Sequence, residues 1–176
     1  MINRIYLTGF MGSGKSTIGP ILANTLGWNF FDLDNVIEKK ENSSVSRIFE
    51  EKGEAYFRKL ESETLIELSS TENSIIALGG GTITTKSNVE VLKKTGKIIY
   101  LRISPESAYY RLRHKRDRPI LTKNGTVNLG KIEFINKINN LLDKRKEFYE
   151  QADIIIDADK ISLGKTVDKI VKLITD

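Results

Sequence analysis

A glycine-rich segment, residues 9–17, directly follows the first apolar run of the chain. It reads Gly-Phe-Met-Gly-Ser-Gly-Lys-Ser-Thr, so that Gly9 is followed after four residues by Gly14, Lys15 and Ser16. In this pattern glycines let backbone N–H groups turn toward phosphate oxygens, the lysine adds positive charge, and the serine hydroxyl can ligate Mg²⁺. A turn that binds nothing is the alternative, but a strand before and a helix after are the setting in which the motif binds phosphate. We therefore expect a nucleoside triphosphate site.

Two carboxylates, Asp32 and Asp34, stand at the end of the second apolar run, Phe30 to Leu33. Side chains two residues apart on an extended chain point the same way, here beyond the end of the strand. Beside a phosphate loop, one carboxylate can hold Mg²⁺ through its water shell and the other can accept the proton of an attacking hydroxyl. The alternative is that Asp34 only caps a helix beginning near Val36, which would leave Asp32 unexplained.

Arg58 and a run of three glycines are the next candidates for ligand binding. Arg58 has Glu54 at i−4 and Glu61 at i+3, which favours a helix-surface ion pair over an arginine oriented to bind a carboxylate. Residues 79–81 are all glycine and follow the buried run 75–78. Three glycines are excessive for an ordinary turn and indicate that backbone closely approaches a ligand.

Basic residues gather in two further segments. Residues 111–129 combine several arginines with Arg118-Pro119-Ile120-Leu121 and a turn-rich stretch, 122–126, which predicts either a loop that closes over bound nucleotide or a solvated loop. His114 lies within this charge run, and we expect no catalytic role for it. Arg145 belongs to a second charge run, 141–149, on a predicted long helix, where the pattern alone indicates a solvated face.

Composition narrows the classes of function. The chain has 176 residues, a net charge of +5, no cysteine and one histidine. Disulfides and thiol catalysis are excluded, and any metal should have oxygen ligands. The positive charge favours anionic partners, but the basic segments lack the interleaved aromatic residues of a nucleic-acid surface. No apolar run approaches ~20 residues and the first strand begins at once, so we expect no membrane span, no leader peptide and a cytoplasmic protein.

Apolar runs alternate with helical patterns along a single domain. We predict strands at 3–8, 29–33, 74–78, 97–103 and 153–157, and helices at 15–26, 34–41, 44–52, 54–70, 87–95, 105–114, 131–151 and 162–174. Continuous strand hydrophobicity indicates a parallel sheet covered on both faces. The fold class is therefore α/β, a three-layer αβα arrangement around a five-stranded parallel sheet, with ligands at the carboxyl ends of the strands. Pro20 should kink the first helix or cause an irregular early turn.

Taken in order, these segments resemble the shikimate kinases, small P-loop enzymes similar to the nucleoside-monophosphate kinases. The likeness covers nearly the whole chain. It rests on residues 9–17, Asp32 with Asp34, Gly53-Glu54 with Phe57-Arg58 and Glu61, Gly79 to Gly81, Arg118 to Leu121, and Arg145 with Tyr149.

The resemblance implies a P-loop NTPase fold and phosphorylation of the 3-hydroxyl of shikimate by Mg-ATP, on the route to chorismate and the aromatic amino acids. It implies catalytic roles for Lys15, Asp34 as base, and Arg118 from a lid. Further implied contacts are with ATP at Gly12, Ser13, Gly14, Lys15, Ser16, Thr17, Arg111 and Arg118, with Mg²⁺ at Ser16 and Asp32, and with shikimate at Asp34, Phe49, Phe57, Arg58, Gly79, Gly80, Gly81 and Arg145. Val45 would help wall the shikimate pocket.

The resemblance also implies a monomer with one kinase domain over 1–176. Its core would be 1–33, 72–111 and 127–176, with a substrate-binding insert at about 34–61 and a mobile lid at about 112–126. Glu147 replaces a proline usual in the family, and adenine contacts are placed only as a candidate region, 157–160. The alternatives are another small-molecule kinase such as a gluconate kinase, a non-catalytic nucleotide-binding module, and, with least support, a nucleic-acid-binding protein.

Overall fold

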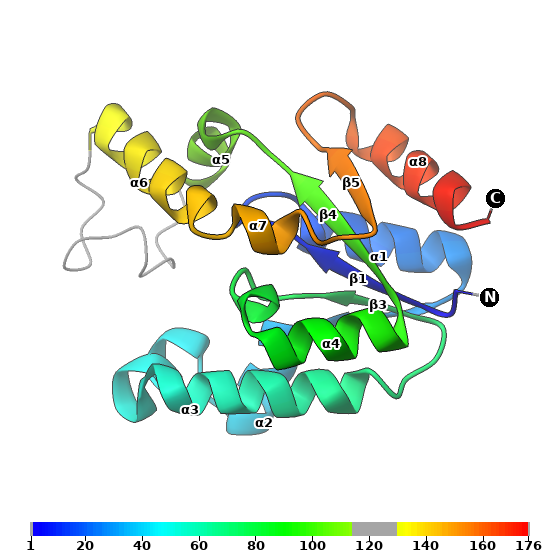
Figure 1. The fold of residues 1–176 in the computed structure, drawn as a ribbon, viewed down its shortest axis with the longest axis horizontal. Helices are drawn as coiled ribbons and strands as arrows, with labels where there is room; N and C mark the ends of the chain where they lie inside the picture. The colour runs from blue at the N-terminus through cyan, green and yellow to red at the C-terminus, as the bar shows by residue number, and fades with distance from the viewer. Residues whose placement is uncertain (1, 114–129, 176) are drawn as a thin grey trace.

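The computed structural model, which describes residues 2–113 and 130–175, is built on a parallel five-stranded sheet with the order β2-β3-β1-β4-β5 (Figure 1). All five predicted strands are confirmed, each to within one residue at either end. They are β1 (Arg4–Thr8), β2 (Asn29–Asp32), β3 (Ser74–Ala77), β4 (Lys97–Arg102) and β5 (Ile154–Asp157). The phosphate loop therefore leaves the carboxyl end of the central strand.

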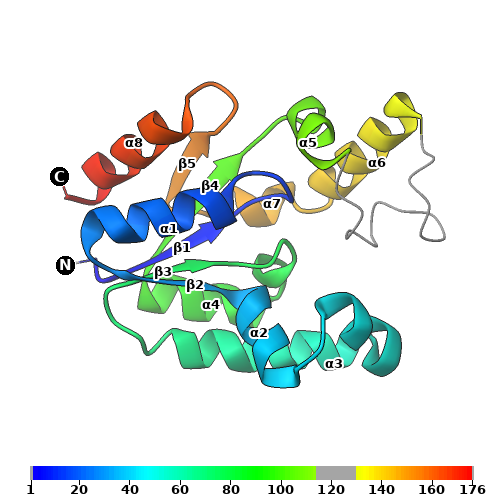
Figure 2. The ribbon, with the colours of Figure 1, turned by 180° about the vertical axis from the view of Figure 1, so that it is seen from behind.

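Helices cover both faces of this sheet, which confirms the three-layer αβα prediction. Helices α1 and α8 lie on one face, and α3 and α4 lie on the other (Figures 1 and 2). The helical elements are α1 (Lys15–Leu26), α2 (Leu33–Glu41), α3 (Val45–Leu68), the 3₁₀ turn η1 (Thr82–Thr84), α4 (Lys86–Thr95), α5 (Pro105–Leu112), α6 (Lys131–Asp143), α7 (Lys146–Tyr149) and α8 (Leu163–Thr175).

Two apolar clusters, one on each face of the sheet, hold the layers together. Alternate residues of β1 belong to different clusters. Ile5 and Leu7 pack with α1, α6 and α8, whereas Tyr6 packs with α2, α3 and α4. All three side chains are fully buried. Burial on both faces explains why the strands are continuous apolar runs and why the sequence pattern located them.

The long helix α3 is interrupted at Gly53, where two separate helices were predicted to meet. Gly53 has φ 82° and ψ 168°, a backbone conformation open to glycine and costly for other residues. The segment before it, residues 45–52, packs beside α2, and the segment after it carries Phe57, Arg58 and Glu61. The interruption thus falls between the segment beside α2 and the segment that carries these candidate ligand-binding residues.

The prediction of one helix over 131–151 is wrong. Helix α6 ends at Asp143, and the short α7 begins at Lys146, with Arg145 between them at φ −111° and ψ −5°. The cause lies in the packing, because Phe134 on α6 belongs to the cluster beneath one face of the sheet and Tyr149 on α7 to the cluster on the other. One straight helix could not place side chains in the clusters on both faces of the sheet.

Helix α1 is continuous from Lys15 to Leu26, so the irregular turn expected at Pro20 is absent from it. Its neighbour Gly19 lies so close to β2 that a Cβ there would stand 2.2 Å from the Phe30 ring.

None of the helices within the described residues is both long and apolar enough to cross a membrane.

Candidate active site

The phosphate loop joins β1 to α1 and has the backbone that its glycines permit. Gly9, Gly12 and Gly14 all have positive φ, at 146°, 80° and 100°. A Cβ at Gly9 would stand 2.6 Å from the carbonyl oxygen of Leu101, so the loop has no room for a larger residue there. The Lys15 ammonium donates to the Gly9 carbonyl at 2.7 Å and to the Phe10 carbonyl at 3.2 Å. The loop thus encloses its own lysine at the N-terminus of a twelve-residue helix.

Ser16 and Asp32 meet at the edge of this loop. The Ser16 hydroxyl donates to Oδ2 of Asp32 at 2.9 Å, which joins the first turn of α1 to the end of β2. Two oxygen ligands beside a phosphate site suit Mg²⁺, which takes few protein ligands and completes its shell with water and phosphate. In the described part of the chain no group of three His, Cys, Asp or Glu side chains is placed to hold a metal, so this pair is the candidate.

The expectation that Asp32 and Asp34 both project from an extended chain is wrong. Asp32 ends β2 and caps α2, accepting a hydrogen bond from the Asn35 amide at 3.4 Å, and Asp34 lies in the first turn of that helix. Asp32 is thus the cap, the role considered above for Asp34. Asp32 contacts Ser16, whereas Oδ1 of Asp34 lies 3.0 Å from where a Cβ on Gly79 would stand.

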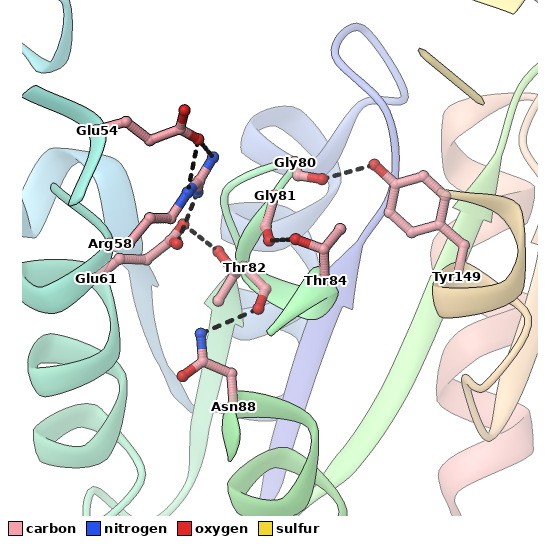
Figure 3. Close-up of polar contacts among 9 residues, drawn as sticks. All are labelled: Glu54, Arg58, Glu61, Gly80, Gly81, Thr82, Thr84, Asn88 and Tyr149. Atoms are coloured by element: carbon pink, nitrogen blue, oxygen red, sulfur yellow. Dashed lines mark hydrogen bonds and ion pairs between the residues drawn. The ribbon is translucent and has the colours of Figure 1, made fainter. Parts of the chain in front are cut away.

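Arg58 is held by two acidic residues of its own helix (Figure 3). Nη1 lies 2.8 Å from Oε2 of the fully buried Glu61, and Nη2 lies 3.2 Å from Oε1 of Glu54. Burial would lower the pKa of the Arg58 guanidinium, but the ion pairs with Glu61 and Glu54 outweigh it and raise that pKa. The predicted pairs are present, and they fix the guanidinium rather than leave it on an open helix surface.

The glycine run at 79–81 is fixed through its carbonyl oxygens. The Gly79 carbonyl accepts from the Thr82 amide at 3.2 Å, and the Gly80 carbonyl from the Tyr149 hydroxyl at 2.8 Å. The Gly81 carbonyl accepts from the Thr84 hydroxyl at 2.7 Å. These three bonds orient every carbonyl group of the run.

Side-chain contacts secure the residue after the run as well (Figure 3). The Thr82 hydroxyl donates to Oε1 of Glu61 at 2.6 Å, and the Asn88 amide donates to the Thr82 carbonyl at 3.0 Å. No pattern in the sequence assigns a role to Thr82 or Asn88. Neither belongs to a pattern, and their partners become neighbours only in the folded chain.

Two arginines converge on the glycine run from different elements. A Cβ at Gly81 would stand 2.7 Å from Nη2 of Arg58, and a Cβ at Gly80 would stand 3.1 Å from Nη1 of Arg145. Arg145 is therefore not on a solvated helix face, because the break between α6 and α7 turns it toward the run. Two guanidinium groups beside glycine backbone can bind a carboxylate with hydrogen bonds of fixed direction.

Phe49 and Phe57 form an apolar wall beside Arg58. Their ring centroids are 4.6 Å apart, and the Arg58 guanidinium carbon lies 5.5 Å from the centroid of the Phe57 ring. Val45 and Phe49 are partly buried against the same cluster as Phe57. The three predicted wall residues therefore all belong to α3 and pack in the same apolar cluster.

Arg111 connects the phosphate loop to the chain after β5. It donates to the Gly12 carbonyl at 2.9 Å and to the Ala158 carbonyl at 3.4 Å, and its guanidinium lies 3.7 Å from Asp159. The candidate adenine region, 157–160, thus lies beside Arg111. Arg118 and most of the expected lid, from residue 114 onward, lie outside the described residues.

Comparison with known proteins identifies the family. The family model for shikimate kinase matches residues 11–175. The chain belongs to the shikimate kinase family. Among curated relatives, the shikimate kinase of Chlorobaculum parvum is 44% identical over 170 residues, covering 97% of this chain and 91% of the relative.

Solved structures of shikimate kinases agree with this fold. The crystal structure of shikimate kinase from Bacteroides thetaiotaomicron has a TM-score of 0.91 at 36% identity and covers both chains completely. Shikimate kinase from Acinetobacter baumannii in complex with shikimate has a TM-score of 0.89 at 35% identity, covering 99% of this chain and 94% of that one. As a member of the shikimate kinase family, the chain is an ATP-dependent kinase with the P-loop fold.

Proposed function

We propose that this chain transfers the γ-phosphoryl group of ATP to the 3-hydroxyl of shikimate, a step toward chorismate and the aromatic amino acids. The observation that carries the proposal is the convergence of Arg58 and Arg145 on the glycines 80 and 81. A kinase acting on a neutral sugar would have no use for two fixed guanidinium groups at its acceptor site. Shikimate offers both a carboxylate and ring hydroxyls to such a site.

Shikimate would lie between the two arginines and the glycine run. Arg58 and Arg145 would bind its carboxylate and ring hydroxyls, and the backbone of residues 79–81 would approach the ring closely. Phe49 and Phe57 would cover its apolar side. The fixed positions of Arg58 and the glycine run support this arrangement, since groups held before the ligand arrives lose little entropy on binding.

Asp34 would act as the base. As the oxygen of the 3-hydroxyl bonds to the γ-phosphorus and the bond to the β-phosphate oxygen breaks, the hydroxyl proton would pass to the Asp34 carboxylate. ADP leaves with the electron pair of the broken bond. The position of Oδ1 beside Gly79 supports this role, because it places the carboxylate at the run where the ring would lie.

ATP would bind along the phosphate loop. The backbone of residues 12–17 and the Lys15 ammonium would neutralise the phosphates, and Arg111 would lie against the adenine beside region 157–160. Its contacts with Gly12 and Ala158 support that placement. Arg118, proposed to reach the phosphates from the lid at 112–126, completes the catalytic set.

Ser16 and Asp32 would hold Mg²⁺, Ser16 directly and Asp32 through water. Their oxygens fit the ion, since Mg²⁺ prefers hard oxygen ligands and few protein side chains. Bound there, the ion would neutralise phosphate charge during transfer. We further propose a cytoplasmic monomer, with one domain over 1–176, a substrate-binding insert at about 34–61, and no nucleic-acid or membrane partner.

Release of ADP from Mg-ATP tests the function, with shikimate, gluconate and no acceptor measured in parallel. Turnover confined to shikimate is expected. Turnover with gluconate instead would keep the phosphate loop and overturn the acceptor site. ATP binding without turnover on any acceptor would favour a non-catalytic nucleotide-binding module.

A further inference from the structure

Tyr149 reaches the glycine run from α7 (Figure 3). Its hydroxyl donates to the Gly80 carbonyl at 2.8 Å, a contact between residues 69 apart in the chain. The side chain is fully buried, and its ring stacks on Tyr100 of β4 with centroids 4.8 Å apart and planes 17° apart. The position of the hydroxyl is thus fixed by the backbone of α7, which carries the residue, and by the stacking of its ring on β4.

This bond determines where the next amide points. The described chain contains no cis peptide bond, so in the peptide between Gly80 and Gly81 the carbonyl and the N–H point in opposite directions. A Gly80 carbonyl held toward Tyr149 therefore directs the Gly81 N–H away from α7. The carbonyls of Gly79 and Gly81 are held by residues 82–84, close in sequence, whereas the Gly80 carbonyl is held from a distant element.

The same contact sets the position of Arg145. The Tyr149 amide donates to the Arg145 carbonyl at 3.0 Å, so one helical turn joins the two residues. With the tyrosine hydroxyl bound to Gly80, the start of that turn is held beside the glycine run, where Nη1 of Arg145 lies 3.1 Å from the Cβ position of Gly80. Burial raises the pKa of the Tyr149 phenol above its ordinary value, with Arg145 opposing, so the hydroxyl stays a donor at neutral pH.

We propose that Tyr149 is a positioning residue for the acceptor site: its hydroxyl orients the Gly80–Gly81 peptide and holds Arg145 beside it, so that both meet the acceptor in a preset geometry. The inference rests on the proposed function, because it takes shikimate as the acceptor. Tyr149 acts through Gly80 and Arg145, and its loss should affect shikimate and not ATP.

The test compares Tyr149→Phe with wild type and with Tyr100→Phe. Phenylalanine keeps the ring, its burial and its stacking, and removes only the hydroxyl. Tyr100→Phe is the matched control, since it removes the hydroxyl of the other stacked ring and leaves the Gly80 bond intact. For Tyr149→Phe we expect KM for shikimate to rise about fivefold, the size of one lost hydrogen bond, with KM for ATP unchanged. Calorimetry of shikimate binding without ATP should show the same weakening.

The outcomes separate this inference from the proposed function. If wild type does not phosphorylate shikimate, the proposed function fails and the role of Tyr149 fails with it. If wild type is active and Tyr149→Phe matches it in shikimate KM and affinity, only the positioning role is overturned. Equal changes in KM for shikimate and ATP, or an equal effect of Tyr100→Phe, would also overturn it, because they indicate a general packing role.

Discussion

Nη1 of Arg58 lies 2.8 Å from Oε2 of Glu61, while the other oxygen of that buried carboxylate accepts a hydrogen bond from Thr82. One carboxylate thus joins α3 to the end of the glycine run. The arginine that would hold the substrate and the backbone that would approach it are fixed by the same group. Their relative position is therefore set before any ligand binds.

Replacing Arg58 by alanine should weaken shikimate binding far more than ATP binding and should also lower the free energy of unfolding. Glu61 would stay buried without its partner, but the Arg58 side chain is 29% exposed, so the loss should be smaller than the ~3–5 kcal/mol typical of a fully buried pair. Steady-state kinetics for both substrates and chemical denaturation would measure the two effects. Arg47→Ala is the control, since Arg47 pairs with Glu51 at the surface and should matter by less than about 1 kcal/mol. Equal weakening of both substrates would mean that Arg58 is only structural.

Asp34→Asn should leave ATP affinity nearly unchanged and lower kcat by about 10²–10⁴-fold, the usual contribution of a general base. The amide has almost the same shape and cannot accept the proton. Nucleotide binding by fluorescence and turnover by ADP release would separate the two properties. Glu63→Gln makes the same acid-to-amide change on the exposed surface of α3 and should have no effect on turnover. Undiminished kcat in Asp34→Asn would remove the residue from its proposed role.

Asp32→Asn should raise the Mg²⁺ concentration needed for half-maximal activity without unfolding the protein. Asparagine caps helices as well as aspartate does, so α2 keeps its cap. The negative charge facing Ser16 is lost, and the metal site is weakened. Activity titrated with Mg²⁺ at saturating ATP, together with the melting temperature, would test this. An unchanged Mg²⁺ requirement contradicts the assignment of Asp32 to the metal.

Stability should fall at alkaline pH because of Tyr100. Burial, with a smaller contribution from Tyr149, raises the pKa of Tyr100 to about 12 from its ordinary value near 10. A raised pKa means that the unfolded state loses its proton first, so the stability present below pH 10 is lost as the pH rises toward 12. Each pKa unit corresponds to about 1.4 kcal/mol in the free energy of unfolding. Denaturation from pH 8 to 12 should show a shallower loss for Tyr100→Phe, and identical slopes would contradict the prediction.

The sheet and the phosphate loop could be predicted because their signals are local. Each strand is buried on both faces and is therefore an apolar run, and the loop needs its glycines at fixed spacing. Gly53 marked the interruption of α3 for the same reason, since its positive φ suits glycine. In these segments the residue types themselves report the backbone conformation.

The acceptor site depends on contacts that no local pattern records. The charge run around Arg145 predicts an exposed helix surface. In the structure the helix breaks there, because the chain crosses from one face of the sheet to the other. The sequence pattern places Asp34 at the end of a strand, whereas in the structure α2 begins at Leu33 and Asp34 lies in its first turn. The resemblance to a known family indicated these residues, but the contacts that fix the end of the glycine run, from Thr82 to Glu61 and from Asn88 to Thr82, emerged from the fold.

The strand order has a consequence for synthesis on the ribosome. Strand β1 is made before the other four strands, yet it lies between β3 and β4, pairing Arg4 with Ser74 and Ile5 with Lys97. This apolar strand and the phosphate loop attached to it therefore lack one sheet partner until β3 ends at Ala77, and the other until β4 ends at Arg102. Such delayed, long-range pairing slows folding and exposes the nascent strand to aggregation. The strand that is made before the other four thus completes its pairing only after β4 has been made.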